Sequence, residues 1–248
     1  MYKIVLLRHG ESAWNKKGLF TGWVDVDLTS HGEHEAREAG RRLKAAGFKF
    51  DLVFENFLKR CSQTTNLVLR AMNIHPKIQK DWRLNERHYG ALQGMNKKEM
   101  VAEYGEQKVF AWRRSYNIHP PKIKRGSRYD QSDNISYKGI PVPRTESLHD
   151  VEQRVKSFWL EKAIPALKKK RVVLISTSGN SLRALVKFLG KVSAEKVSGL
   201  NIPTGLPLVY ELDKDFHLQK YYYLATKKEL LEAVNKVKNQ IKNKKSSV

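Results

Sequence analysis

Arg8, His9 and Gly10 bring together three residue types that suit phosphoryl transfer. A neutral imidazole can attack phosphorus, and an adjacent guanidinium can bind phosphate oxygens and neutralise the charge that opposes the attack. Glycine lets the backbone turn sharply after the histidine. Alone, the tripeptide is more often part of a surface loop that carries a solvated arginine and a hydrogen-bonded histidine. Its position in the chain is what favours transfer through a phosphohistidine.

An apolar run at residues 3–7 precedes this tripeptide. Continuous runs of β-branched and leucine residues are typical of strands buried on both faces, usually in a parallel sheet. Arg8 and His9 would then stand at the carboxyl end of the first strand. Open α/β sheets bind their ligands at that edge, so the position predicts a functional site.

The composition indicates a protein that attracts anions. Lys and Arg number 47 against 25 Asp and Glu, which gives the 248-residue chain a formal net charge of +22. Such a field draws phosphorylated metabolites or nucleic acid. Nucleic acid is not expected as a partner, because the sequence has no zinc-finger spacing, ribonucleoprotein aromatic motif or basic region leading into heptads. The basic runs at 168–171 and 236–245 are interpreted as solvated surface.

The cysteine count and the hydropathy limit the class of protein further. Cys61 is the single cysteine, so the chain can form neither an internal disulfide nor a cysteine-based zinc site. No apolar stretch reaches about 18 residues, and the first residues enter the predicted strand directly, which predicts neither a membrane span nor a signal peptide. We expect a cytoplasmic protein with a single domain over 1–240, a lid-like insertion at 116–145 and a basic flexible tail at 241–248.

Strands and helices are predicted to alternate along the chain, which favours a three-layer α/β/α fold with a mostly parallel central sheet flanked by helices. Residues 14–28 and 82–94 show no helical or strand period and are predicted to be loops. Arg60 falls in the first turn of a predicted helix and would point toward the sheet edge that carries His9. Further strands are expected at 51–55, 171–176, 208–212 and 216–223, and helices at 30–46, 58–72, 97–104, 108–114, 147–167, 182–189 and from 226 onward.

Longer motifs support a family resemblance: RHGES, FTGW, LNERHYGALQG, WRRSY, GNSLRALVK and NIPTGLPLVYELD. With them, residues 2–241 resemble the 2,3-bisphosphoglycerate-dependent phosphoglycerate mutases of the histidine phosphatase superfamily. The resemblance implies a phosphoglycerate mutase-like fold and the interconversion of 3-phosphoglycerate and 2-phosphoglycerate in glycolysis and gluconeogenesis. It also implies 2,3-bisphosphoglycerate as the primer of the phosphohistidine, no metal, and a homodimer or homotetramer.

The resemblance assigns roles to individual residues. His9 matches the nucleophile, and Glu86 matches the group that protonates and deprotonates the substrate hydroxyls, a task to which a carboxyl sheltered among aromatic residues can be tuned. The matching phosphate and substrate ligands form an electrostatic clamp of the kind that accelerates phosphoryl transfer. These ligands are Arg8, Ser12, Asn15, Thr21, Gly22, Arg60, Arg87, Tyr89, Lys97, Arg113, Arg114, Gly179 and Asn180.

Simpler interpretations exist for several of these residues when each is taken alone. Arg113 and Arg114 could end an exposed helix, and Glu86 could be a surface carboxylate. The motifs around them favour the functional interpretation instead. For Trp14 and Trp112, packing in a loop or in the core remains the better prediction.

The sequence departs from the family at Ser178, where the pattern Ala-His-Gly-Asn-Ser has its second catalytic histidine. A serine hydroxyl is shorter and neutral, although it can donate one hydrogen bond. Loss of one transition-state donor typically costs about 10² to 10³ in rate. Glu55 and Asn56 replace the usual Thr-Ser or Ser-Ser pair, which would bring an acid near the anion site if Glu55 faces inward. Within a shortened insertion, Ser136 replaces an arginine before Tyr137, which puts lid closure in question.

Three functions therefore stay open. The favoured one is a mutase that acts through phospho-His9 with lowered turnover, because the nucleophile, the acid-base group and the arginines are all retained. The second is a family member that has lost turnover and binds phosphorylated ligands, acidic partners or nucleic acid through its positive surface. The third is a bisphosphoglycerate synthase or phosphatase, since water can intercept a poorly protected phosphohistidine.

Overall fold

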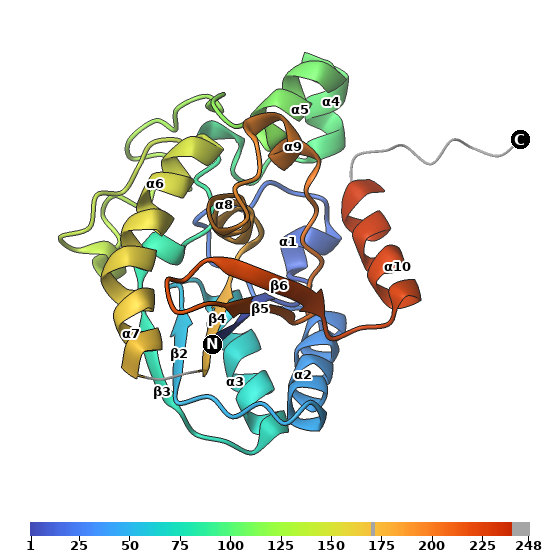
Figure 1. Cartoon of the computed structure of the whole chain (residues 1–248). Helices are drawn as coiled ribbons and strands as arrows, with labels where there is room; N and C mark the ends of the chain where they lie inside the picture. The colour runs from blue at the N-terminus through green and yellow to red at the C-terminus, as the bar shows by residue number, and fades with distance from the viewer. Residues whose placement is uncertain (170–171, 240–248) are drawn as a thin grey trace, which may run out of the picture.

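A six-stranded sheet runs through the centre of the protein in the order β3-β2-β4-β1-β5-β6 (Figure 1). The structure, a computed structural model, describes residues 1–169 and 172–239. Strands β3, β2, β4 and β1 pair in parallel, whereas β5 runs antiparallel to both of its neighbours. The predicted mostly parallel sheet is confirmed. The strands are β1 (Tyr2–Arg8), β2 (Leu52–Glu55), β3 (Lys77–Lys80), β4 (Val172–Thr177), β5 (Leu208–Leu212) and β6 (Leu218–Tyr223).

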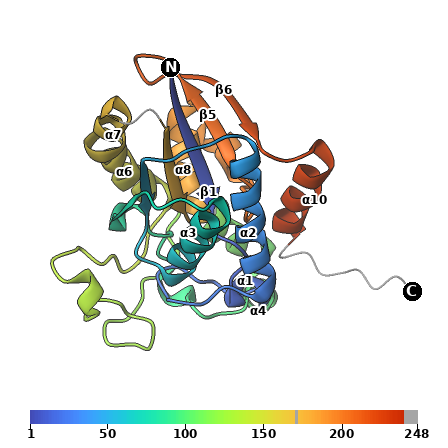
Figure 2. The same ribbon diagram turned by 90° about the horizontal axis from the view of Figure 1, so that it is seen from below.

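Helices cover both faces of the sheet, which confirms the three layers (Figure 2). Alternate residues of β1 supply the two cores, because successive side chains of a strand point to opposite faces. Val5 and Leu7 pack with residues of α2 and α3, and Ile4 and Leu6 pack with residues of α6 and α8. The helices are α1 (Ala13–Lys16), α2 (Ser30–Ala45), α3 (Lys59–Met72), α4 (Lys97–Tyr104), α5 (Glu106–Arg114), α6 (Leu148–Phe158), α7 (Ile164–Lys169), α8 (Gly179–Leu189), α9 (Ala194–Gly199) and α10 (Lys227–Lys238).

Two predicted elements need correction because of local backbone chemistry. The helix expected over 147–167 is interrupted by a π-helical turn, Trp159–Ala163. Pro165 follows this turn and has no amide hydrogen for the carbonyl four residues earlier, so the regular pattern cannot continue unchanged. The strand expected from residue 216 begins at Leu218, since Phe216 has a left-handed φ of 64° at the end of a turn.

Short elements account for the other differences. Helix α1 lies inside the loop predicted at 14–28, where Ser12 and Asn15 form a reciprocal cap. The helix predicted from 182 begins at Gly179, and the one predicted from 108 begins at Glu106. Two 3₁₀ turns, Trp82–Leu84 and Gly90–Leu92, form in the loop predicted at 82–94. Strand β3 and helix α9 were not predicted, because one is a short exposed edge strand and the other a six-residue helix without an apolar period.

The insertion at 116–145 has little regular structure, and Figure 2 shows part of it extending beyond the helices. Its one helical element is the 3₁₀ turn Ile135–Tyr137. Buried Tyr137 ties the insertion to the body, with its ring 4.9 Å from Trp23 and 5.9 Å from Phe57 between centroids. The tail predicted at 241–248 and the first residue of the strand predicted at 171–176 lie outside the described residues.

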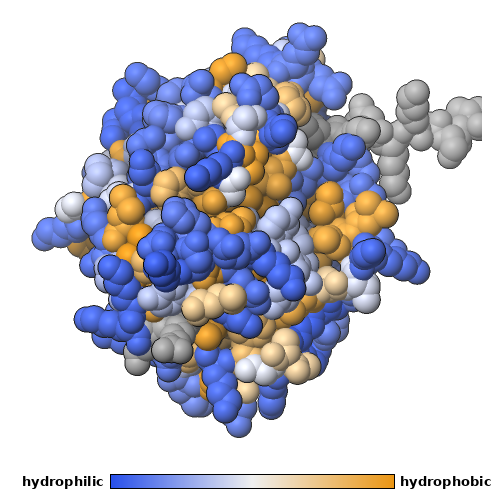
Figure 3. Space-filling view, in the orientation of Figure 1, coloured by the Kyte–Doolittle hydropathy of each residue, from blue (hydrophilic) through white to orange (hydrophobic). Residues whose placement is uncertain are grey.

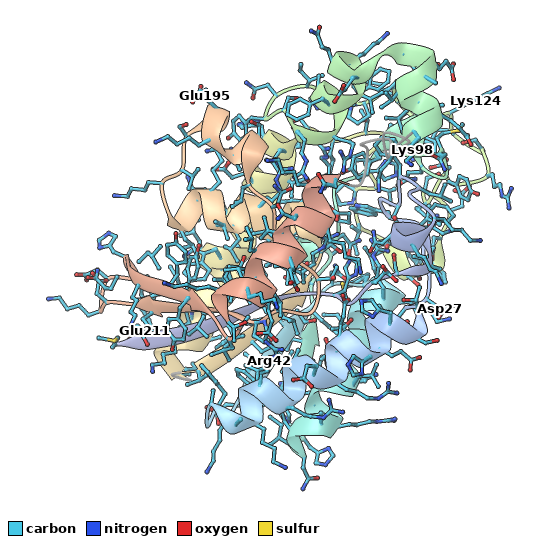
Figure 4. The ribbon with its side chains drawn as sticks, turned by 90° about the vertical axis from the view of Figure 1, so that its right-hand side faces the viewer. Asp27, Arg42, Lys98, Lys124, Glu195 and Glu211 are labelled. Atoms are coloured by element: carbon cyan, nitrogen blue, oxygen red, sulfur yellow. The ribbon has the colours of Figure 1, made fainter. Side chains whose placement is uncertain are left out.

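Helix α10 packs beside α2 and carries the chain back toward the carboxyl edge of the sheet. Arg42 of α2 lies against it (Figure 4), and its Nη2 is 2.6 Å from Oε1 of Glu229. A second ion pair joins Lys236 to Glu11, which follows β1, at 3.2 Å. Hydrophilic residues cover most of the face shown in Figure 3, as the charge of the chain predicts.

Candidate active site

The candidate site lies at the carboxyl edge of the parallel strands. His9 follows β1 directly, Ser178 follows β4, and the His9 amide donates to the Thr177 carbonyl at 3.0 Å. A cavity of about 70 Å³ opens at this edge. Eleven of the predicted site residues line it: Arg8, Asn15, Thr21, Gly22, Glu86, Tyr89, Lys97, Arg113, Arg114, Gly179 and Asn180.

The environment of His9 favours a neutral imidazole. The side chain is 2 % exposed, and its Nδ1 lies 2.7 Å from the Gly10 carbonyl, which places the ring hydrogen on Nδ1. Burial, together with the charges of Arg60 and Arg8, holds the His9 pKa well below its ordinary value. The Nε2 lone pair is therefore retained and can act as a nucleophile.

Arg60 holds the predicted nucleophilic nitrogen of His9 in place. Its Nε donates to His9 Nε2 at 3.2 Å, while its two terminal nitrogens donate to the carbonyls of Val24 at 3.0 Å and Gly22 at 2.9 Å. The first turn of α3 thus directs Arg60 to the sheet edge that carries His9, as predicted. Neither His9 nor Arg60 lines the cavity in this conformation, so a phosphoryl group must replace the Arg60–His9 hydrogen bond to reach Nε2.

Arg8 presents an unused donor at the cavity. One terminal nitrogen donates to the Ile202 carbonyl at 2.7 Å, and the buried Nε has no hydrogen-bond partner among the described residues. Gly179 makes room for it, since a Cβ there would lie 3.2 Å from Arg8 Nε. A buried unpaired donor is costly, and an anion in the cavity would satisfy it.

Glu86 is held by backbone amides rather than exposed at the surface. It is 8 % exposed, and its Oε1 accepts from the amides of Arg87 at 2.8 Å and Asn180 at 3.1 Å. The Asn180 side chain in turn donates to the Tyr89 hydroxyl at 3.0 Å. These bonds fix one carboxylate oxygen, while the cavity receives the side chain that is predicted to handle protons.

A surplus of cations surrounds this single carboxylate among the described cavity-lining residues. Lys97 and Arg113 are each only 7 % exposed, so the exposed-helix alternative for Arg113 is wrong. Burial and the charge of Arg113 hold the Lys97 pKa well below its ordinary range, and burial with Arg114 lowers the Arg113 pKa to about 10. Repulsion among these groups is relieved when a polyanion binds, so the cavity suits a ligand with several negative charges.

Two of the predicted ligands have other contacts. Ser12 is fully buried and caps α1 by accepting from the Asn15 amide at 3.2 Å. Arg87 donates to the carbonyls of Trp112 at 2.7 Å and Arg113 at 2.6 Å, and its guanidinium lies 4.6 Å from the Tyr89 ring centroid. Neither side chain lines the cavity; Arg87 instead supports residues that do.

The departures from the family pattern lie close together. Ser178 is fully buried, with its Oγ 3.2 Å from Asn56 Nδ2 and 3.6 Å from Cys61 Sγ. Glu55 turns away from the anion site, because its Oε1 accepts from Ser62 at 2.9 Å and lies 3.6 Å from Lys80 Nζ. Glu55 therefore does not face inward, and no acid from this position enters the cavity.

The aromatic residues and one further cation complete the site. Packing is confirmed for both tryptophans, since Trp112 belongs to a buried cluster with Phe20 and Trp14 meets Tyr129 edge-on at 5.4 Å. Sequence reasoning missed the cavity-lining Arg183 and Val237, together with Leu19, Phe20 and Ile202. Arg183 lies four residues after Gly179 on α8, a spacing that places both on one helical face. Nothing in the sequence around Val237 of α10 indicated that this residue lines the cavity.

Comparison with known proteins accords with this geometry. Residues 4–217 match the histidine phosphatase superfamily (branch 1). The chain belongs to this superfamily. It is 47 % identical over 248 residues to a 2,3-bisphosphoglycerate-dependent phosphoglycerate mutase of Borreliella burgdorferi (strain ZS7) and 48 % identical to one of Borrelia garinii subsp. bavariensis, covering 98 % of this chain and 100 % of each relative. The family resemblance inferred from the motifs is thereby confirmed.

Solved structures share the fold of this superfamily member at lower identity. A mycobacterial glucosyl-3-phosphoglycerate phosphatase superposes with a TM-score of 0.70 and 20 % identity, covering 91 % of this chain and 99 % of that one. A putative alpha-ribazole-5'-P phosphatase of Escherichia coli gives 0.67 and 22 %, covering 91 % and 98 %. Within residues 1–169 and 172–239, no group of three His, Cys, Asp or Glu residues is arranged to hold a metal, and no helix is long and apolar enough to cross a membrane.

Proposed function

We propose that this enzyme is a phosphoglycerate mutase that interconverts 3-phosphoglycerate and 2-phosphoglycerate through a phosphohistidine at His9, and that Ser178 lowers its turnover. The observation that carries the proposal is a neutral, buried His9 beside a cationic cavity that also contains Glu86. The substrate class is supported by the relatives at 47 % and 48 % identity over nearly the whole chain.

The chemistry follows from these two side chains. In the primed enzyme His9 carries the phosphoryl group. Glu86 takes the proton from the free hydroxyl of phosphoglycerate, whose oxygen bonds to phosphorus as the bond from phosphorus to His9 Nε2 breaks. His9 Nε2 then bonds to the other phosphorus of the resulting bisphosphoglycerate as its bond to the substrate oxygen breaks, and Glu86 gives its proton to that departing oxygen. Arg8 and Arg60 neutralise the charge on the transferring group.

The remaining cavity residues suit the other charges of the substrate. Lys97, Arg113 and Arg114 are assigned to its carboxylate and second phosphate, together with Asn15, Thr21 and Tyr89. 2,3-Bisphosphoglycerate fits the same cations, since the buried Nε atoms of Arg8 and Arg183 lack partners among the described residues. When bound, it would supply the phosphoryl group that primes His9.

The first experiment measures turnover of 3-phosphoglycerate in the presence of 2,3-bisphosphoglycerate. We expect turnover by the unmodified chain, none by His9→Ala, and slow mutase turnover by Glu86→Gln. Ser176→Ala is a matched control, because the Ser176 hydroxyl is buried on β4 and has no hydrogen-bond partner among the described residues. The proposal would be refuted if the unmodified chain neither turned over 3-phosphoglycerate nor acquired a labelled phosphoryl group at His9 from 2,3-bisphosphoglycerate. That result would favour a binding function of the basic surface.

The lowered rate has a separate test. Ser178→His combined with Asn56→Ser restores an imidazole and removes the side chain that contacts position 178. We expect the double variant to raise kcat by about 10². Release of inorganic phosphate from 2,3-bisphosphoglycerate, measured in the same samples, shows whether phosphatase activity exceeds mutase activity.

We further propose that the protein works in the cytoplasm as a homodimer or homotetramer, as its family membership suggests. Light scattering coupled to size-exclusion chromatography measures the mass in solution. A mass equal to the 28.7 kDa of one chain would refute the oligomer.

A further inference from the structure

Ser178 stands at a helix start without acting as its cap. It is the N-cap residue of α8, yet its side chain makes no capping hydrogen bond. Serine at this position normally accepts from an amide in the first helical turn. The Ser178 hydroxyl instead meets Asn56 Nδ2 at 3.2 Å and Cys61 Sγ at 3.6 Å. The hydroxyl is therefore directed away from α8 toward the start of α3.

The hydrogen bonds of Asn56 fix the orientation of its amide. Its Oδ1 accepts from the Leu58 amide at 3.0 Å, and its Nδ2 faces the Leu84 carbonyl at 3.2 Å. The reverse orientation would leave the Leu58 hydrogen facing an NH₂ group and would oppose two oxygens at Leu84. Asn56 therefore faces Ser178 Oγ with a donor, its two Nδ2 hydrogens being shared among three acceptors at 3.2 Å, the Leu84 carbonyl, Thr177 Oγ1 and Ser178 Oγ. Its own oxygen is already used.

The hydrogen of the Ser178 hydroxyl remains available. Thr177 also accepts from Asn56, at 3.2 Å, but donates its own hydrogen to the Leu84 carbonyl. Among the described residues Ser178 has no such carbonyl partner, and its other neighbour is the Cys61 sulfur, a weak acceptor. Burial raises the Cys61 pKa to about 12, so that sulfur is an uncharged thiol. A phosphoryl oxygen would be a far stronger acceptor for this hydrogen.

The position of Ser178 relative to His9 follows from the sheet and from α3. Arg8 pairs with Thr177 in the register of β1 and β4, so His9 and Ser178 are each the first residue beyond that pair. Neighbouring residues of α3 reach the two side chains, with Arg60 at His9 Nε2 and Cys61 at Ser178 Oγ. Ser178 and His9 therefore follow neighbouring strand ends, and both side chains face the first turn of α3.

We propose that Asn56 is a positioning residue for phosphoryl transfer: by donating to Ser178 Oγ, it directs the Ser178 hydroxyl hydrogen to the phosphoryl group at His9. This inference rests on the proposed function. Donation from Asn56 also polarises the hydroxyl, which makes it a better donor. Asn56 and Ser178 then act as one unit in place of the absent imidazole.

The test compares kcat and KM for the full chain, Asn56→Ser, Ser178→Ala and the double variant Asn56→Ser/Ser178→Ala. We expect Asn56→Ser to lower kcat by about tenfold with little change in KM, because the bond acts on the transition state. In the double variant kcat should equal that of Ser178→Ala alone, since Asn56 has no other route to the phosphoryl group. Ser176→Ala, whose buried hydroxyl has no partner among the described residues, should leave kcat unchanged.

A second variant guards against loss of folding. Asn56→Asp keeps the shape of the side chain but replaces the donor with a carboxylate, which accepts the Ser178 hydrogen and withdraws it from the phosphoryl group. We expect it to lower kcat at least as much as Asn56→Ser, with the fold checked by circular dichroism. Should Asn56→Ser unfold, an unchanged kcat in folded Asn56→Asp would still overturn the inference.

The outcomes separate this inference from the proposed function. Unchanged kcat in the folded Asn56 variants, or fold-losses of Asn56→Ser and Ser178→Ala that multiply in the double variant, would overturn the role of Asn56 and leave the mutase intact. A full chain that neither turns over nor is labelled at His9 by 2,3-bisphosphoglycerate would overturn both.

Discussion

Acidification should destabilise this protein through His88, in the segment between Glu86 and Tyr89. His88 is fully buried, and its Nδ1 accepts from the Gly90 amide at 3.1 Å. The ring hydrogen is therefore on Nε2, which has no hydrogen-bond partner among the described residues. Burial lowers the His88 pKa to about 4, against an ordinary value of 6.5. A second proton on Nδ1 would break the contact with Gly90 and place a charge in the interior.

The magnitude follows from proton linkage. Below pH 6.5 the unfolded chain binds a proton at His88 that the folded chain does not bind until about pH 4, so the stability present above pH 6.5 is lost as the pH falls. Between pH 7 and pH 5 this single group costs about 2 kcal/mol. His9, whose pKa is also lowered, acts in the same direction.

Urea denaturation at pH 7 and pH 5 measures this loss, and His88→Asn isolates the contribution of His88. An asparagine oxygen can still accept from the Gly90 amide but cannot be protonated in this range. From pH 7 to pH 5 the free energy of unfolding should fall in both proteins. We expect this fall to be about 2 kcal/mol smaller in His88→Asn than in the unmodified chain. Equal losses in the two proteins would show that His88 is not the group that titrates.

Three further predictions concern the site and its support. Gly90→Ala should lower the free energy of unfolding, measured by denaturation, by about 3 kcal/mol, because φ is +59° and a Cβ would lie 2.0 Å from the Pro121 carbonyl oxygen. The control Gly47→Ala has a φ of +73° but open space around the Cβ, so it should cost about 1 kcal/mol. Arg183→Met should raise KM for 3-phosphoglycerate about tenfold, with exposed Arg70→Met unchanged as the control. The lowered Lys97 pKa predicts that kcat/KM falls as Lys97 loses its proton at a pH below the ordinary lysine range, and Lys97→Arg should move that decline to higher pH. A decline at the same pH in the variant would refute the assignment to Lys97.

Local sequence patterns were sufficient to place a site residue where that residue belongs to, or directly follows, the strand or helix that the pattern predicts. The apolar run at 3–7 predicted β1, and the register of a parallel sheet then placed His9 at its carboxyl edge. The same reasoning placed Arg60, because a helix that follows a strand begins at that edge. The roles of Glu86, Lys97 and Arg113 came from the family motifs, since nothing in their own segments showed that they would be buried together.

Contacts between segments far apart in the chain could not be predicted from local sequence patterns. Val237 reaches the cavity only because α10 packs beside α2, and no period in the tail announces that packing. The four-residue spacing from Gly179 indicates that Arg183 lies on the same helical face, toward the cavity. In a chain with so many basic residues, however, an arginine by itself does not indicate a binding site. Arg87 was assigned to the substrate by its motif, whereas in the fold its guanidinium supports Tyr89 and the end of α5.

The two adjacent substitutions at 55 and 56 show why sequence alone left their effect open. Successive strand residues point in opposite directions, so Glu55, paired in register with Ser176, turns to Ser62 and Lys80 while Asn56 turns to Ser178. In the sequence, Glu55 suggested an acid against the phosphate, and Ser178 suggested an isolated loss. In the fold, Glu55 points away from the site, and Ser178 contacts Asn56, which lies 122 positions away in the chain. The change at 178 is therefore better understood as one half of a coupled pair, and its effect on the rate depends on which residue occupies position 56.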